Sequence, residues 1–304
     1  MILHPLMERY IENPDVEQKF DPEFGWVLKP NFKKNGIEIN SLGFRSSQEF
    51  NFETDFRKKV LLLGDSMVFG FGVFQKSIFS ELLNREYKDV IFVNSGVNGY
   101  STWQEYLVLK KYVHQIKPDL IILFYTQEND MFENPRQDRF HPGVVLMNNE
   151  PVYQQAKPEN KVPLYQKSMA YRLLNQKVLY GKDFTYLFQK LDFGMRRENS
   201  NVWRIAQRIL QKMTEIKNEE KIRFVIVDVP TRNQLRNPKM KRTRQNLLRK
   251  LSQEEGLLYY DLLNFYPKNF EPLFLPNDPH WNSNGHQFIA DSLKEKILPE
   301  FEFK

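Results

Sequence analysis

The 304-residue sequence contains no cysteine. This absence excludes disulfide bonds, thiolate metal sites and cysteine nucleophiles, and it suits a cytoplasmic protein as well as a periplasmic one. The sequence also lacks a long apolar run, since no stretch approaches the roughly 20 apolar residues that span a bilayer. We therefore expect no stable membrane insertion.

The N-terminus lacks the apolar core of a signal peptide, which takes about 7 or more apolar residues in a row. Pro5, Glu8 and Arg9 interrupt the sequence before such a run can form. We expect a cytoplasmic protein from the sequence as it stands, and a periplasmic or membrane-associated one if an N-terminal anchor has been removed.

Neither sign of charge dominates the chain. Its 44 basic and 38 acidic residues give a net charge of +6 and are interspersed along most of its length. The densest basic run, residues 239–250, is interleaved with Leu247, Leu248 and Leu251, which is typical of a surface helix with one buried stripe. We therefore expect no nucleic-acid partner, and a basic nucleic-acid patch on this helix is the last-ranked alternative.

Apolar residues make up 41% of the chain with tyrosine and tryptophan included, and five short continuous runs of them stand out. Such runs are typical of strands that are buried on both faces of a parallel sheet. The segments between them, at 78–83, 106–116 and 202–216, repeat apolar residues with helical period. The alternation predicts an α/β fold with helices on both faces of a parallel sheet and an active site at the carboxyl ends of the strands. The five runs are 60–63, 90–93, 120–124, 224–229 and 257–260.

Two regions do not fit this alternation. Residues 1–57 carry scattered prolines and aromatics without a sustained period, and we interpret them as an extended segment or a small accessory lobe. Residues 58–304 then form the main domain, with an insertion at about 131–200. The insertion begins with a loop rich in proline and asparagine at 134–163 and continues into helical stretches around 170–178. A long insertion at this edge is expected to shape a substrate pocket or lid.

The first predicted strand runs directly into Gly64-Asp65-Ser66. A serine at the point where a strand gives way to a helix presents its hydroxyl at the edge of the sheet, and its backbone N–H can bind an oxyanion. Gly64 allows a tight turn, and Asp65 can brace that turn through backbone hydrogen bonds. Taken alone, the tripeptide is more typical of a serine that caps a helix.

Two further strand ends carry groups that can bind the same oxygen. Gly96 and Gly99 follow the second strand, and Asn129 follows the third. A glycine N–H and an asparagine side-chain N–H can converge there with Ser66 N–H to form an oxyanion hole. Ordinary turn chemistry is the alternative at each position, because Asn-Gly and Asn-Asp are favoured turn pairs.

A histidine suited to general-base catalysis stands just before the last predicted helix. His280 can accept the serine proton and return it to a leaving alkoxide, because an imidazole ordinarily titrates near neutral pH. Asp278 can bind the other ring nitrogen and fix the tautomer, while Pro279 stiffens the loop between them. The remaining histidines are expected outside the site: His4, His114, His141 and His286.

Four blocks, taken in order, resemble the signature blocks of the SGNH (GDSL-like) hydrolases. The resemblance covers roughly residues 58–296, and the segments 25–26 and 40–45 resemble the N-terminal lead-in of a bacterial branch of that family. The blocks are Gly64-Asp65-Ser66, Gly99, Asn129-Asp130 and Asp278-Pro279-His280-Trp281-Asn282.

This resemblance implies a flavodoxin-like three-layer α/β/α sandwich with a five-stranded parallel sheet. It also implies ester chemistry that needs neither a metal nor another cofactor. The roles that it implies are Ser66 as nucleophile, His280 and Asp278 as the acid–base pair, and Gly99 and Asn129 as oxyanion donors beside Ser66 N–H.

The sequence departs from the family pattern at two points. Gln127 stands where glycine is expected in the third block, and a single residue separates Asp278 from His280 where many members have two. Three functions stay open: hydrolysis of an ester, transfer of its acyl group to a sugar hydroxyl by the same site, and carbohydrate binding without catalysis.

The insertion bears on the expected substrate. It is polar and aromatic, without an extended apolar lid, and it contains Tyr153, Tyr165 and Tyr171. These features favour a small-molecule ester, with a short acyl group on a carbohydrate or similar polar compound, over a long-chain lipid.

Overall fold

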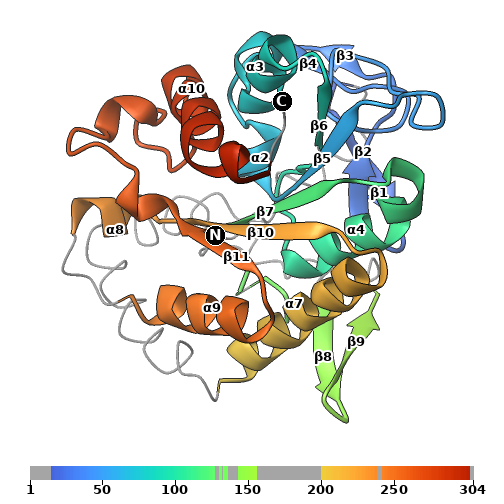
Figure 1. Cartoon of the computed structure of the whole chain (residues 1–304), viewed down its shortest axis with the longest axis vertical. Helices are drawn as coiled ribbons and strands as arrows, with labels where there is room; N and C mark the ends of the chain where they lie inside the picture. The colour runs from blue at the N-terminus through green and yellow to red at the C-terminus, as the bar shows by residue number, and fades with distance from the viewer. Residues whose placement is uncertain are drawn as a thin grey trace, which may run out of the picture.

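The structure of the protein is a computed structural model that describes residues 15–126, 130–131, 133–135, 143–155, 200–237 and 242–301. Its centre is a five-stranded parallel sheet with the strand order β11–β10–β7–β5–β6 (Figure 1). Numbered along the chain, this is the order 2-1-3-4-5 of flavodoxin-like, doubly wound folds. The predicted sheet is confirmed, and each of the five apolar runs forms a strand. The strands are β5 (Lys58–Leu63), β6 (Val90–Asn94), β7 (Leu120–Thr126), β10 (Arg223–Val229) and β11 (Leu258–Asp261).

Helices cover both faces of the sheet, so the predicted three-layer sandwich is confirmed. Leu61 and Leu63 of β5 belong to a core shared with α4, α7 and α9, whereas Val60 and Leu62 belong to a second core with α2, α3 and α10. No helix among the described residues is long and apolar enough to cross a membrane. The α-helices are α2 (Ser66–Phe69), α3 (Phe79–Glu86), α4 (Thr102–Ile116), α7 (Asn201–Glu219), α8 (Arg232–Arg236), α9 (Thr243–Glu254) and α10 (Ser283–Ser292). Shorter helical turns are η1 (Gln75–Ser77), η3 (Leu262–Asn264), η4 (Glu271–Leu273), η5 (Leu293–Ile297) and η6 (Leu298–Phe301).

Residues 15–57 form two small antiparallel hairpins, β1 (Gln18–Asp21) with β2 (Gly25–Leu28), and β3 (Lys33–Lys34) with β4 (Ile37–Glu38). Trp26 is completely buried in the core that α4 shares with the sheet, and its Nε1 donates a hydrogen bond to the Asn98 carbonyl at 2.9 Å. The Tyr100 hydroxyl donates to the Trp26 carbonyl at 2.7 Å. This segment is therefore packed directly onto the sandwich.

Part of the insertion is a β-hairpin, where the sequence analysis predicts only a loop. Strands β8 (Gly143–Met147) and β9 (Glu150–Gln154) pair through a two-residue turn at Asn148 and Asn149, whose φ angles are 52° and 64°. Such left-handed pairs suit asparagine and match the twist of a tight hairpin, so two asparagines between apolar runs are the signal for it. The helical stretch predicted at 170–178 lies outside the described residues.

Candidate active site

Ser66 is the first residue of α2 and follows β5 almost directly. The Asp65 side chain caps this short helix, because its Oδ1 accepts a hydrogen bond from Met67 N at 2.9 Å. Gly64 provides space, since a Cβ there would lie 2.3 Å from Val68 Cγ2. Ser66 N–H has no hydrogen-bond acceptor among the described residues, as befits the first N–H of a helix. Both the hydroxyl and the N–H are thus presented at the carboxyl edge of the sheet.

A continuous chain of hydrogen bonds joins Ser66 to the histidine and aspartate predicted beside it. His280 Nε2 lies 2.7 Å from Ser66 Oγ, and His280 Nδ1 lies 2.6 Å from Asp278 Oδ1. Only one residue separates Asp278 from His280, yet the two side chains still make this contact. Asp278 Oδ1 also accepts a hydrogen bond from His280 N at 2.9 Å, so the carboxylate is turned toward the imidazole ring. The structure therefore brings together three of the five predicted site residues.

The charges along this chain suit proton transfer. The hydrogen bond to His280 holds the pKa of Asp278 below its usual range, so this carboxyl is ionised at neutral pH. An ionised Asp278 keeps a proton on Nδ1 of the ring, which leaves the Nε2 lone pair directed at Ser66 Oγ. The arrangement can remove a proton from the serine hydroxyl.

The loop that carries Asp278 and His280 is a tight turn. Leu275 N–H donates to the His280 carbonyl at 2.9 Å, and Asn277 takes a left-handed conformation with φ of 55°. Asn282 then caps α10 by accepting hydrogen bonds from two backbone N–H groups of its first turn. The last sequence block thus contains a turn, a base and a helix cap in succession.

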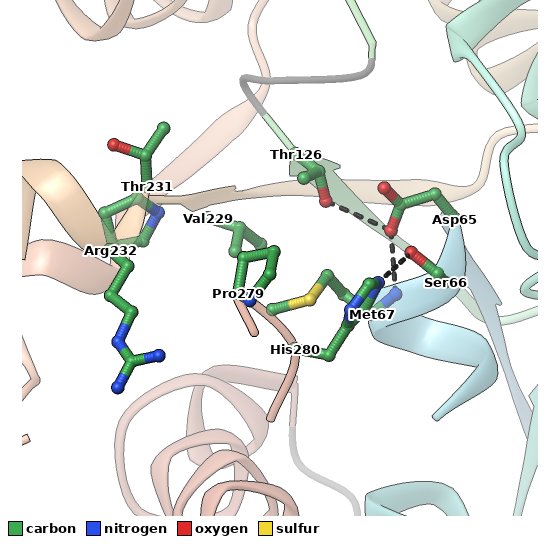
Figure 2. A pocket seen from close by; sticks show the side chains of 10 residues that line it. Asp65, Ser66, Met67, Thr126, Val229, Thr231, Arg232, Pro279 and His280 are labelled. Atoms are coloured by element: carbon green, nitrogen blue, oxygen red, sulfur yellow. Dashed lines mark hydrogen bonds between the residues drawn. The ribbon is translucent and has the colours of Figure 1, made fainter. Parts of the chain in front are cut away.

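A cavity of about 30 Å³ opens beside Ser66 and His280 (Figure 2). Thr126 at the end of β7 forms part of its wall and donates to Asp65 Oδ1 at 3.2 Å. Thr231 and Arg232, which follow β10, lie across the cavity from Ser66 (Figure 2). This volume holds one or two water-sized groups.

The two candidate oxyanion glycines lie in the loop between β6 and α4. Gly96 N–H donates to Asn94 Oδ1 at 3.0 Å, and a Cβ at Gly96 would lie 2.4 Å from a backbone nitrogen of α2. Gly96 therefore permits the loop to pack against α2, and its own N–H is occupied. Gly99 has a left-handed φ of 81°, and its N–H has no acceptor among the described residues. Gln127 and Asn129 lie outside the described residues.

A larger cavity, of about 400 Å³, lies between α4, α7 and the β8–β9 hairpin. Trp103 and Tyr153 line it, and the Ser66–His280 pair does not. Tyr153, which the sequence analysis associates with the substrate, stacks on Trp103 and donates to a carbonyl of the N-terminal segment at 2.7 Å. The other two tyrosines that are expected near the substrate lie outside the described residues: Tyr165 and Tyr171.

The other described histidines make contacts outside this chain of hydrogen bonds. His286 is buried in α10, where burial lowers its pKa to about 3 and its Nδ1 accepts a hydrogen bond from Phe79 N. His114 lies on the surface of α4, 3.4 Å from a carboxylate oxygen of Glu220. Two histidines lie outside the described residues: His4 and His141.

Two features of the site have no counterpart in the sequence analysis. One is a buried pair of carboxyl groups, Glu105 of α4 and Asp130, behind the Asp65 cap. The other is the contact of Arg232 with the turn that carries His280. Among the described residues, no three His, Asp or Glu side chains are grouped as a metal site requires.

Solved structures of several esterases and acylhydrolases are similar to this chain. The psychrotrophic esterase EstA from Pseudoalteromonas sp. is 12% identical, with 80% of this chain and 98% of that chain covered and a TM-score of 0.48. The lipase/acylhydrolase from Enterococcus faecalis is 14% identical, with 81% and 98% covered and a TM-score of 0.45. The acetyl xylan esterase AlAXEase is 15% identical, with 79% and 99% covered and a TM-score of 0.44. No protein-family model and no curated protein matches the sequence.

Proposed function

We propose that the protein is a serine esterase of the SGNH hydrolase type, in which Ser66 attacks an ester carbonyl and His280 acts as its base. The observation that carries the proposal is the chain from Ser66 Oγ through the His280 ring to Asp278, with distances of 2.7 and 2.6 Å. These hydrogen-bonded side chains lie at the carboxyl ends of the strands, where doubly wound sheets bind their ligands.

The reaction proceeds in two steps through an acyl-enzyme. His280 Nε2 takes the hydroxyl proton as Ser66 Oγ bonds to the carbonyl carbon, and the tetrahedral intermediate then expels the alcohol, which receives that proton. Water repeats the sequence on the acyl-serine and releases the acid and the free enzyme. Asp278 stays ionised and stabilises the imidazolium in both steps.

Three donors are proposed for the oxyanion: Ser66 N–H, Gly99 N–H and the Asn129 side chain. Both backbone N–H groups have no acceptor among the described residues, which leaves them able to bind a negatively charged oxygen. Ser66 N–H and Gly99 N–H lie in segments that pack closely, because Gly96 brings the β6–α4 loop against α2.

The proposed substrate carries a short acyl group on a carbohydrate or another polar alcohol. The cavity beside Ser66 measures only about 30 Å³, and this small volume favours a short acyl group over a long one. A panel of chromogenic esters from acetate to palmitate tests this choice. Highest kcat/KM at acetate or propionate is expected, whereas a steady rise with chain length would show that the substrate is a lipid.

The activity itself is tested with para-nitrophenyl acetate and with a fluorophosphonate that labels activated serines. The wild type should hydrolyse the ester and carry the label on Ser66 in mass mapping, and Ser66→Ala should lose both while unfolding at the same temperature. Ser41→Ala, a change at an exposed serine, serves as the matched control and should keep both. A folded wild type that neither hydrolyses nor labels would contradict the proposal.

The same site supports transfer of the acyl group to a sugar hydroxyl, which only requires that hydroxyl to replace water in the second step. Addition of candidate sugars to the acetate assay would then yield an acetylated sugar at the expense of free acetate. The non-catalytic alternative, a carbohydrate-binding protein, is disfavoured because the hydrogen-bonded chain from Ser66 to Asp278 is complete.

A further inference from the structure

We propose that Arg232 is a positioning residue for the acid–base pair, and that its guanidinium holds the turn with Asp278 and His280 in place opposite Ser66. This inference rests on the proposed function, because it concerns the placement of that reaction's base.

Arg232 reaches the turn from a distant part of the chain. It is the first residue of α8, and its Nη1 donates to the carbonyl oxygen of Asp278 at 3.0 Å and to that of Leu275 at 3.3 Å. Leu275 also closes the turn by donating its N–H to the His280 carbonyl. A single guanidinium nitrogen therefore binds the carbonyls of two turn residues that are three positions apart in the sequence.

The guanidinium is fixed from its other sides as well. Glu271 Oε2 accepts hydrogen bonds from Nε of Arg232 at 3.1 Å and from its Nη2. The guanidinium carbon lies 5.3 Å from the centre of the Phe274 ring, and the Arg232 side chain is only 15% exposed. These contacts engage all three nitrogens, a fork that lysine cannot reproduce.

Arg232 acts through the turn and not on the substrate. Arg232 lines the cavity, but its guanidinium points away from Ser66 (Figure 2) and donates to carbonyl groups of the turn. Its positive charge also helps to lower the pKa of Asp278, after the larger effect of the His280 hydrogen bond. Both effects favour an ionised Asp278 and a ring directed at the serine hydroxyl.

Removal of the guanidinium should therefore impair the chemical step more than substrate binding. Without it, the Asp278 carbonyl loses its partner, the Leu275 carbonyl keeps only the hydrogen bond from Asp278 N–H, and the turn can shift. A displacement of about 1 Å in a catalytic group can lower a rate about 100-fold.

The first test compares Arg232→Met, which keeps an apolar stem, with Arg236→Met as a matched control. Arg236 lies on the same helix and binds the same Glu271 at 2.8 Å, but it is 53% exposed and contacts the other carboxylate oxygen. We expect kcat of Arg232→Met to fall at least about tenfold, with KM within about twofold of the wild type. Arg236→Met should match the wild type, and Arg232→Lys, which keeps the charge, should lose less. An unchanged kcat, or a loss confined to KM, in Arg232→Met would overturn the proposal.

Proton NMR supplies a readout that needs no turnover. The Nδ1 proton between His280 and Asp278 should give a strongly downfield resonance, assigned by its loss in His280→Gln. It should persist in Arg236→Met and broaden or disappear in Arg232→Met; if that variant does not fold, Arg232→Lys should show partial broadening. A resonance that is unchanged without the guanidinium would overturn the positioning role. The resonance could also depend on Arg232 while the protein hydrolyses no ester. That result would refute the proposed function and leave the positioning role of Arg232 intact.

Discussion

Two carboxyl groups share a buried position behind the nucleophile. Glu105 and Asp130 are 1% and 0% exposed, and three of their four carboxyl oxygens accept no hydrogen bond among the described residues. Two buried carboxyl groups without such donors are costly to ionise, and ionisation of one favours the protonated form of the other. Burial raises the pKa of both groups well above the usual range, and the nearby Asp65 carboxylate raises both further. The pair therefore keeps a proton to higher pH than the same groups do in the unfolded chain.

This shared proton makes stability depend on pH. The unfolded chain releases it above about pH 4, whereas the folded chain keeps it to higher pH. The free energy of unfolding therefore falls as the pH rises through this interval, and the stability is fully present only below it. In Glu105→Gln an amide donates to Asp130 and no proton has to be retained.

We expect the melting temperature of Glu105→Gln, relative to wild type, to increase steadily between pH 5 and pH 9 in thermal unfolding followed by circular dichroism. Glu53→Gln, at an exposed position, should show no such trend. A difference that stays constant or shrinks as the pH rises would show that the pair holds no proton.

The site residues that act through their side chains are predictable from the sequence, because serine, histidine and aspartate are diagnostic residue types. The order of the sequence blocks predicts that three of these residues lie close together, and the structure brings them within hydrogen-bond distance: Ser66, His280 and Asp278. Arg232 could not be found in this way, because it binds backbone carbonyls 46 and 43 residues away, and a carbonyl has no sequence signature. Glu105 likewise has no sequence signal that separates it from an exposed helix residue, because its neighbour Asp130 is brought close only by the fold.

At the scale of elements, a single arginine holds the segment that follows the nucleophile helix. Arg45, 1% exposed, donates to the carbonyls of Phe69 and Gly70 at 2.6 and 2.7 Å and to that of Val73 at 2.6 Å. Burial lowers its pKa to about 10, so it is charged at neutral pH. The end of α2 and the chain after it thus depend on a residue from the N-terminal segment.

Arg45→Met should destabilise the protein strongly. The Gly70 carbonyl keeps the hydrogen bond from Val73 N–H, so the change leaves two carbonyls unpaired, those of Phe69 and Val73. An unpaired buried acceptor costs about 1–3 kcal/mol, so the free energy of unfolding should fall by at least about 2 kcal/mol. Urea unfolding measures this loss. Arg57→Met, which removes a partly exposed ion pair with Asp55, should cost less than about 1 kcal/mol. Equal effects of the two changes would mean that the hydrogen bonds of buried Arg45 contribute no more to the free energy of unfolding than a surface ion pair.

The strands are predictable from the sequence because both of their faces are buried, which makes each run continuously apolar. Val60 to Leu63 shows this most clearly, with alternate residues in the two cores. In the β8–β9 hairpin, β8 has a short apolar run at 144–147, but β9 has none because its residues are exposed or half-buried. The signal of the hairpin is the pair Asn148-Asn149. The turn between β1 and β2 has a local signal, because Asp21 Oδ1 accepts from Glu23 N and Phe24 N and Gly25 has a φ of 81°. The burial of Trp26 against α4 has no such local signal.

At the scale of the whole molecule, the N-terminal segment and the sandwich share one hydrophobic core. Phe24, Trp26 and Leu28 belong to the same cluster of buried side chains as the α4 face of the sheet. Gln104 of α4 also donates to the Phe24 carbonyl at 2.8 Å. We propose that residues 15–57, although recognisable as a separate segment in the sequence, do not unfold on their own.

Hydrogen exchange read by mass spectrometry in mild denaturant tests this coupling. Trp26→Ala removes a fully buried side chain and should cost about 3–5 kcal/mol. Because the core is continuous, protection should fall by the same free energy in β2 and in β5, which are far apart in the sequence but open together. Phe56→Ala, at a side chain that is 95% exposed, should change neither strand. Loss of protection in β2 with β5 unchanged would show instead that the segment is an independent lobe docked on a self-sufficient sandwich.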